Sequence, residues 1–364
     1  VPSRLVPDAT TKAVCGFCST GCGLKIHLQD GEAINLTPDP DYPVNLGTAC
    51  PKGWEALSVL DAPDRAKMPI LHGKEVDWDT ALKYFCGKMR EILDKHGPEA
   101  AAYLSTGQIM FEEMAFLGAL AKFGMGMIHG DGNTRQCMAT AVTAYKESFG
   151  FDAPPFTYAD FEESDVLVFI GANPCIAHPI MWQRVLRNKR QPEIIVVDPR
   201  KTDTASSADL HLPLKPGTDV MLFHGMLRVM WVNGWTDQDY IRNYTDGFDD
   251  LLEKVMACTP DKVQDVCGIS TKQLHQAAEW FATSKATLSL YCQGLNQSSS
   301  GTAKNASLVH LHLATGHIGK PGAGPFSLTG QPNAMGGREV GGLANLLSAH
   351  RDLANPVHRT EVAS

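Results

Sequence analysis

The sequence lacks any uninterrupted apolar run of the roughly 18 to 20 residues that a transmembrane helix needs, so we expect no membrane span. It also lacks an excess of basic residues, since 32 Lys and Arg face 40 Asp and Glu for a formal net charge of −8. A nucleic-acid-binding surface would need the opposite balance, and we expect no nucleic-acid partner.

The N-terminal residues Val1-Pro2-Ser3-Arg4 contain neither an apolar signal core nor a twin arginine. The expected location is therefore the cytoplasm. The chain begins without Met, which leaves a removed leader open. At its other end the chain stops inside a helical pattern, at Val362-Ala363-Ser364, and we expect it to be the N-terminal fragment of a longer protein.

We also expect no disulfide scaffold, although the chain has ten cysteines. Such scaffolds belong to small secreted domains, whereas this chain is long and acidic. Four of the cysteines fall within the first 50 residues. The others stand singly, at Cys86, Cys137, Cys175, Cys258, Cys267 and Cys292.

Residues 1–66 are rich in Gly, Pro and Cys, with a strand-like stretch at 24–28 and a hairpin turn at Asp30-Gly31. So small a module has little core of its own, and a metal cluster would hold it together. Next come a helix at 78–94 with Asp77 or Asp79 as its cap, a strand at 101–104 and a helix at 110–123.

The middle of the chain alternates short apolar runs with helical patterns and contains neither an internal repeat nor a low-complexity tract. This alternation predicts a Rossmann-like parallel sheet. The predicted strands are 166–170, 194–197 and 286–291, and the predicted helices are 180–188 and 220–232.

The strongest motif is Cys15-x2-Cys18-x3-Cys22-x27-Cys50-Pro51. Three thiolates in one tight loop and a distant fourth are typical of a [4Fe–4S] site. A zinc site also needs four ligands, but usually as two separated pairs. Free buried cysteines would not explain this spacing.

Lys52 follows Cys50 by two residues. It is either a solvated side chain or a charge placed between the cluster and a second cofactor.

Polar turns follow the predicted strands at Gly171-Ala172-Asn173-Pro174, Asp198-Pro199-Arg200 and Pro216-Gly217-Thr218-Asp219. Such turns let a nucleotide phosphate approach the backbone at the carboxyl edge of a sheet. The G-x-G-x-x-G spacing is absent, so ordinary turns of an α/β fold are the alternative.

Cys137, at the start of a predicted helix, is either a thiolate ligand or a partly buried cysteine.

In their order along the chain, these motifs resemble the molybdopterin oxidoreductase family, of the dimethyl-sulfoxide-reductase type. The resemblance covers essentially all residues and also includes Gly107-Gln108, Asn133 and Thr329-Gly330-Gln331-Pro332. It implies an α/β fold: a small iron–sulfur module followed by Rossmann-like parallel α/β domains, with the C-terminal β-barrel domain absent. The implied domains are 1–66, 67–134 with 331–364, and 135–330.

The resemblance implies two cofactors, a [4Fe–4S] cluster on the four N-terminal cysteines and a molybdenum bis-molybdopterin guanine dinucleotide with Cys137 as its protein ligand. Lys52 would bridge the two cofactors. The other residues implied to line the pterin cofactor are Gln108, Asn133, Gly171, Asn173, Asp198, Arg200, Thr202, Gly217, Asp219, Gln293 and Gln297.

Within the family, assimilatory nitrate reductases are the most similar group. Met138 follows Cys137 as in nitrate reductases, where formate dehydrogenases have His, and Gln293 stands where periplasmic nitrate reductases have Met. Arg338 is the candidate for orienting nitrate, with a local salt bridge as the alternative. Formate dehydrogenase and a non-catalytic electron-transfer subunit are the other functions considered. Implied electron donors are ferredoxin, flavodoxin or a flavin subunit using NADH.

Overall fold

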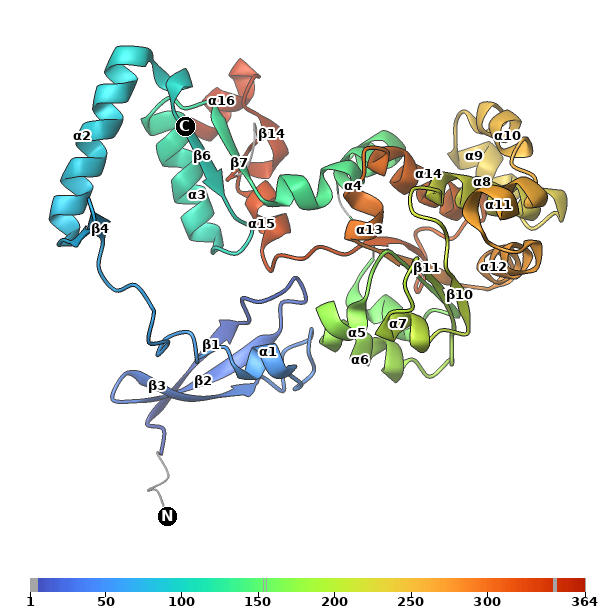
Figure 1. The fold of residues 1–364 in the computed structure, drawn as a ribbon, viewed down its shortest axis with the longest axis horizontal. Coiled ribbons are helices and arrows are strands. Elements are labelled where there is room, and N and C mark those ends of the chain that lie inside the picture. The colour runs from blue at the N-terminus through green and yellow to red at the C-terminus, as the bar shows by residue number, and fades with distance from the viewer. Residues whose placement is uncertain (1–5, 153, 155, 343–345, 364) are drawn as a thin grey trace. The chain divides into compact units, whose positions relative to one another are not determined.

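The computed structural model describes residues 6–152, 154, 156–342 and 346–363 and forms two compact units (Figure 1). The first unit comprises Val1–Arg135 and Gln331–Ser364, and the second Gln136–Gly330. The units are described one at a time below. The domain boundaries drawn from the sequence stay predictions, and the N-terminal residues Val1-Pro2-Ser3-Arg4 lie outside the described part.

The first unit begins with an antiparallel sheet of β1 (Ala9–Val14), β2 (Gly23–Gln29) and β3 (Glu32–Pro38), in that order. Asp30 and Gly31, with φ of 53° and 83°, join β2 to β3. Two successive positive φ angles give the turn whose twist matches a hairpin, so the hairpin predicted here is confirmed. The short helix α1 (Pro51–Trp54) follows the sheet.

Helix α2 (Trp78–His96) confirms the predicted helix, and the Asp77 carboxylate caps it by accepting a hydrogen bond from Thr80 N at 2.7 Å. Its predicted apolar face is covered only in part within the described residues. Met89 and Leu93 pack against a small core cluster, whereas Leu82 and Phe85 are more than half exposed. The neighbouring elements are β4 (Ile70–Leu71), β5 (Lys74–Glu75) and the 3₁₀ turn η1 (Pro98–Ala100).

Strands β6 (Ala102–Ser105) and β7 (His129–Gly132) form a parallel pair. The helix predicted at 110–123 is α3 (Phe111–Ala119), which continues as the π-helical turn η2 (Leu120–Gly124). Buried Lys122 donates to the Gly341 carbonyl at 2.6 Å, and burial lowers its pKa to about 8. The unit ends with α15 (Ala334–Glu339), β13 (Leu346–Leu347), η4 (Ser348–His350), β14 (Arg351–Asp352) and α16 (Pro356–Ala363).

The second unit is built on a parallel sheet whose described strands lie in the order β10-β9-β8-β11-β12. The predicted strands are confirmed to within a residue as β8 (Val166–Ile170), β9 (Glu193–Val197) and β11 (Thr287–Tyr291). The two outer strands are β10 (Leu210–Leu212) and β12 (Gly324–Ser327).

Helices cover both faces of this sheet, so β8 and β11 are buried throughout, as expected for central parallel strands. Val168 faces a core cluster that includes α8 and α12, while Phe169 faces a second cluster that includes α6. The helices are α4 (Thr134–Phe149), η3 (Tyr158–Glu162), α5 (Pro174–Ala177), α6 (Pro179–Arg187), α7 (Asp203–Ser206), α8 (Asp219–Val232), α9 (Gln238–Tyr244), α10 (Phe248–Met256), α11 (Pro260–Cys267), α12 (Thr271–Thr283), α13 (Gln293–Asn296) and α14 (Gly301–Ala314).

No helix in the described residues is both long and apolar enough to cross a membrane.

Candidate metal and cofactor sites

Three of the four N-terminal cysteines lie in one closed loop between β1 and β2. Cys15 directly follows β1, Cys22 directly precedes β2, and the Cys15 amide donates to the Cys22 carbonyl at 2.9 Å. Gly21 takes a positive φ of 70°, which lets the loop turn back. The loop therefore holds Cys15, Cys18 and Cys22 on a short stretch of backbone tied at both ends.

The fourth cysteine, Cys50, precedes α1, and α1 lies against the loop. A Cβ atom placed on Gly53 of α1 would stand 4.0 Å from the Cys15 Sγ. The segment before Cys50 is tied to β2 by Asn45, which is 1 % exposed. The Asn45 amide group accepts from Gly23 N at 2.8 Å and donates to the Gly23 and Thr48 carbonyls at 3.1 and 2.7 Å.

The thiols also influence one another electrostatically. Burial, and then the neighbouring Cys15, Cys18 and Cys50, raise the pKa of Cys22 to about 12. Burial is likewise the main reason that the pKa of Cys15 is raised, while the ammonium group of Lys52 acts in the opposite direction. All four sulfurs thus share one small volume, with a positive charge beside it.

This donor set fits a cluster better than a single ion. Among the described residues, no three His, Cys, Asp or Glu side chains converge on one metal-ion position. Three thiols in one tight loop and a fourth on an adjacent segment suit a cage with several metal corners, whereas a zinc site usually takes its four ligands as two separated pairs.

In the second unit, the polar turns found in the sequence follow the carboxyl ends of β8, β9 and β10, which lie side by side in the sheet. The sheet order reverses between β8 and β11, and ligands of open α/β sheets bind at such points. There Gly171 and Gly294 touch backbone to backbone: the Gly294 amide donates to the Gly171 carbonyl at 3.1 Å. A Cβ on Gly171 would stand 2.6 Å from the Gly294 Cα.

The remaining predicted residues of this edge are partly held by their own loops. The Asn173 Oδ1 accepts from the Thr204 hydroxyl at 2.7 Å, and the Thr202 hydroxyl caps α7. Buried Asp198 accepts from the Arg200 amide at 2.8 Å. Gly217 has a φ of 86° with open space where a Cβ would stand. Gln297, just after α13, is exposed.

Asp219, the first residue of α8, forms an ion pair of 2.7 Å with Lys304 of α14. Their side chains are only 10 % and 5 % exposed. The helix N-terminus adds favourable positive potential around the carboxylate. Lys304 was not predicted from the sequence, since nothing in the pattern of α14 distinguishes it from a surface lysine.

Cys137 lies in the first turn of α4, as predicted, and is 3 % exposed. Its Sγ accepts a hydrogen bond from the Gln293 Nε2 at 2.9 Å and lies 4.0 Å from the Thr329 hydroxyl. Gln293 follows β11 and Thr329 follows β12. The structure therefore brings Cys137 to the same edge of the sheet as the nucleotide-type turns. Met138 beside it is buried.

Cys292, assigned no role from the sequence, is part of this cluster. Its thiol contacts the Gln293 Oε1 and donates to the Leu328 carbonyl at 3.3 Å. Burial, the largest cause, raises the pKa of Cys292 to about 12, so the group is a neutral thiol.

The other predicted site residues belong to the first unit. The Asn133 Oδ1 accepts from the Gly107 amide at 3.1 Å, next to exposed Gln108. Arg338 is 9 % exposed on α15 and contacts the Met335 sulfur. Lys52 lies on α1.

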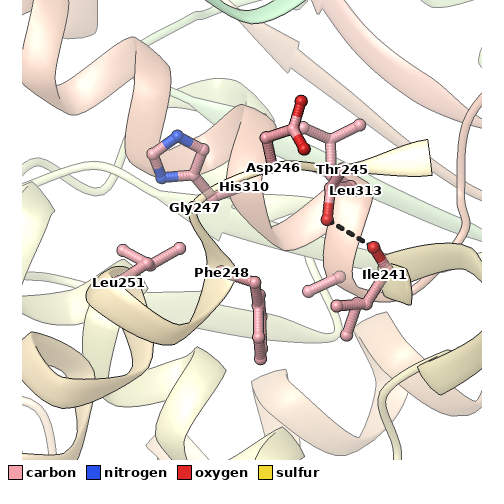
Figure 2. Close-up of a pocket in the computed structure, with 9 residues that line it drawn as sticks. Ile241, Thr245, Asp246, Gly247, Phe248, Leu251, His310 and Leu313 are labelled. Carbon is pink, nitrogen blue, oxygen red and sulfur yellow. Dashed lines mark hydrogen bonds between the residues drawn. The ribbon is translucent and has the colours of Figure 1, made fainter. Parts of the chain in front are cut away.

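A small cavity elsewhere in the second unit carries none of these residues. It lies between α9, α10 and α14, lined by Phe248, Leu251 and His310 among others (Figure 2). His312, on the same helix as His310, bonds to the Ser289 hydroxyl and the His317 carbonyl in the core.

A parallel α/β sheet with a buried thiol at its switch point, together with a four-cysteine module, suits an enzyme that holds an iron–sulfur cluster and a second cofactor. Residues 67–362 match the family "Molybdopterin oxidoreductase", and residues 8–61 match "Molybdopterin oxidoreductase Fe4S4 domain". The chain belongs to the molybdopterin oxidoreductase family, which confirms the resemblance seen in the sequence. These matches support a molybdenum–pterin group and a 4Fe–4S cluster as the cofactors.

Nitrate reductases are among the curated relatives. The "Nitrate reductase" of Synechocystis sp. is 40 % identical over 97 % of this chain and 52 % of its own length. The "Periplasmic nitrate reductase" of Desulfovibrio desulfuricans is 39 % identical over 98 % of this chain and 50 % of its own length. The chain therefore spans about half the length of these relatives.

The fold is shared with a solved structure, acetylene hydratase from Pelobacter acetylenicus, with a TM-score of 0.72 over 86 % of this chain and 44 % of that chain. Its sequence identity is 24 %, so the likeness concerns the fold alone. The predicted mixed α/β fold, with an iron–sulfur module before the parallel sheet, is confirmed.

Proposed function

We propose that the protein containing this chain reduces nitrate to nitrite by oxygen-atom transfer, at a molybdenum bound by bis-molybdopterin guanine dinucleotide. A [4Fe–4S] cluster on Cys15, Cys18, Cys22 and Cys50 would relay the electrons. One observation carries the proposal: the buried Cys137 thiol stands at the carboxyl edge of the parallel sheet, within hydrogen-bond distance of Gln293. The nitrate reductase relatives support the choice of substrate.

When bound, the molybdenum–pterin group supplies oxygen-atom transfer and a two-electron change, chemistry that side chains lack. The chain's own residues would position the cofactor and provide the electrostatics of the site. Cys137 would be the protein ligand of the metal. The residues proposed to hold the guanine dinucleotides are Gly171, Asn173, Asp198, Arg200, Thr202, Gly217, Asp219, Gln293 and Gln297, with Gln108 and Asn133 from the first unit.

Two cations have proposed roles. The Lys52 ammonium is close enough to Cys15 to act on its pKa, so it would also stabilise an added electron on the cluster and is proposed to bridge toward the pterin. Arg338 is proposed to orient nitrate, because a guanidinium binds planar oxyanions in two places at once.

We further propose the assimilatory branch of the family and a cytoplasmic location, supported by Gln293 in the position where periplasmic enzymes have Met. Ferredoxin, flavodoxin or a flavin subunit using NADH are the proposed classes of donor.

The test uses holoenzyme purified from a strain that carries Cys137→Ala in the native gene. Nitrate reduction with a reduced dye should be abolished, while the electron paramagnetic resonance (EPR) signal of the reduced cluster persists. Cys86→Ala, at an exposed position of α2, serves as the control with full activity.

Metal analysis of the wild-type protein distinguishes the alternatives. Iron without molybdenum would point to an electron-transfer subunit and refute the proposal. Turnover of formate instead of nitrate, or nitrate reduction that survives in Cys137→Ala, would refute it as well.

A further inference from the structure

The side chains of Cys292, Gln293 and Cys137 form a short hydrogen-bonded chain that ends on the proposed metal ligand. The Cys292 thiol contacts the Gln293 Oε1, and the Gln293 Nε2 donates to the Cys137 Sγ at 2.9 Å. Cys292 also donates to the Leu328 carbonyl at 3.3 Å. We propose that Cys292 is a positioning residue, which orients the Gln293 amide so that its N–H group faces the metal-bound sulfur.

The chemistry of each group determines which partner donates and which accepts in these hydrogen bonds. A thiolate bound to a metal has no proton and can only accept hydrogen bonds. The Gln293 amide can present either its NH₂ group or its oxygen to that sulfur, and the surrounding hydrogen bonds determine which. An oxygen facing the sulfur would place two electron-rich atoms against each other.

Cys292 removes this ambiguity because its two described hydrogen-bond partners are both amide oxygens. The single thiol proton lies between these two oxygens and is shared by them. A Gln293 oxygen that faces Cys292 therefore receives part of a hydrogen bond, which favours the orientation in which Oε1 points to Cys292 and Nε2 to Cys137. Cys292 is 5 % exposed, so little water reaches this contact to replace the thiol proton.

The backbone holds the three groups in place. Cys292 and Gln293 lie at the carboxyl end of β11, where the Cys292 amide donates to the Ile170 carbonyl of β8 at 3.3 Å. Leu328, which accepts from the thiol, is itself tied to the sheet, since its amide donates to the Tyr291 carbonyl at 2.8 Å. Rigid strand ends thus set the position of each member.

A hydrogen bond to a ligating thiolate withdraws electron density from the sulfur, and such outer contacts tune the potential of the metal. Losing the Gln293 contact leaves the sulfur a stronger donor to the metal, which stabilises the oxidised state. The inference rests on the proposed function, because it requires molybdenum on Cys137.

The experiment measures the midpoint potential of the molybdenum EPR signal in holoenzyme from strains that carry each variant. Gln293→Leu removes the donor and should shift this potential to lower values. Cys292→Ala should shift it in the same direction, and Cys292→Ser, which keeps a hydroxyl donor, should restore it toward the wild-type value.

Cys267→Ala is the matched control, because Cys267 is a fully buried cysteine of the second unit whose thiol donates to the Thr218 carbonyl. It should leave the potential unchanged. The reduced-cluster signal should be the same in every variant.

A molybdenum potential in Cys292→Ala equal to the wild-type value would overturn the inference, as would a serine variant that shifts as far as the alanine variant. Failure of the proposed function gives a different result, since wild-type protein would then contain no molybdenum or would not reduce nitrate.

Discussion

Asp219 and Lys304 join α8 to α14 through an ion pair of 2.7 Å that is almost completely buried. Replacing Lys304 by Met leaves the carboxylate buried without its partner, and removing one member of a buried pair costs about 3–5 kcal/mol. We therefore expect Lys304→Met to lower the thermal unfolding midpoint of the protein clearly, as measured by calorimetry.

Two comparisons sharpen this prediction. Lys272→Met, at an exposed position of α12, should leave the midpoint almost unchanged. The unfolding midpoint of the double variant Asp219→Asn, Lys304→Met should fall less than that of Lys304→Met alone, because no charge is then left unpaired. An equal fall of the midpoint in Lys304→Met and Lys272→Met would contradict the prediction.

Gly171 should tolerate no side chain. Alanine there would combine a positive φ of 54° with a Cβ only 2.6 Å from the backbone of Gly294. The positive φ costs about 1 kcal/mol, and forcing the backbones apart costs a further 1–3 kcal/mol or so. Urea unfolding of Gly171→Ala should show both losses, together with a lower molybdenum content.

Gly234→Ala separates the two causes, since Gly234 has a φ of 70° but open space where the Cβ would stand. It should show only the smaller loss. If the two variants unfold at the same urea concentration, the contact between the two glycines does not matter for stability.

Asn45 should control how firmly the iron–sulfur cluster is held. Asn45→Leu removes three hydrogen bonds in the interior of the first unit, and unsatisfied buried groups cost about 1–3 kcal/mol each. The segment that carries Cys50 is then loose, so iron per chain should fall and the cluster should bleach faster in a chelator.

Asn35→Ala is the matched control for this experiment. Asn35 accepts a hydrogen bond from the adjacent Leu36 amide at 2.8 Å, so its replacement should leave the iron content unchanged. Normal iron retention in Asn45→Leu would refute the role assigned to Asn45.

His312 should make the second unit sensitive to acid. Its Nδ1–H donates to the His317 carbonyl and its Nε2 accepts from the Ser289 hydroxyl, and burial lowers its pKa from 6.5 to about 3. Below about pH 6.5 this histidine binds a proton in the unfolded chain but stays neutral in the folded chain. His312 therefore contributes stability above that pH and loses it as the pH falls, by about 1.4 kcal/mol per unit.

Urea unfolding at pH 7, 6 and 5 checks this prediction. His312→Gln should be less stable at pH 7 but lose less stability on acidification, whereas His275→Gln, at a half-exposed position, should follow the wild type. A slope in His312→Gln as steep as that of the wild type would show that His312 is not responsible.

Features that depend on neighbouring residues could be predicted from the sequence. The Asp77 cap, the turn at Asp30-Gly31 and the strand 166–170 each follow from a few adjacent side chains, and all are present. The spacing of the first three cysteines belongs to the same class, because one short loop holds them.

Contacts between distant segments could not be predicted in this way. Asn45 and Lys304 are polar residues without a motif, and their importance appears only when the fold buries them. The exposed face of α2 shows the opposite case, since the periodic pattern predicts the helix correctly but says nothing of what covers Leu82 and Phe85.

The two proposed cofactor sites differ in how much of the chain must fold to form them. One uses the closed loop between β1 and β2, and the other uses the edge of the parallel sheet. The cysteines of the loop and Cys50 come from the N-terminal module, which can present its sulfurs as soon as that short stretch has folded. The sheet edge collects Cys137, Gly171, Gln293 and Thr329 from almost the whole second unit. If the proposed sites are correct, the cluster needs only the N-terminal module, whereas the sheet-edge residues proposed for the pterin come together only after most of the second unit has folded. We therefore expect the cluster to be loaded before the pterin cofactor.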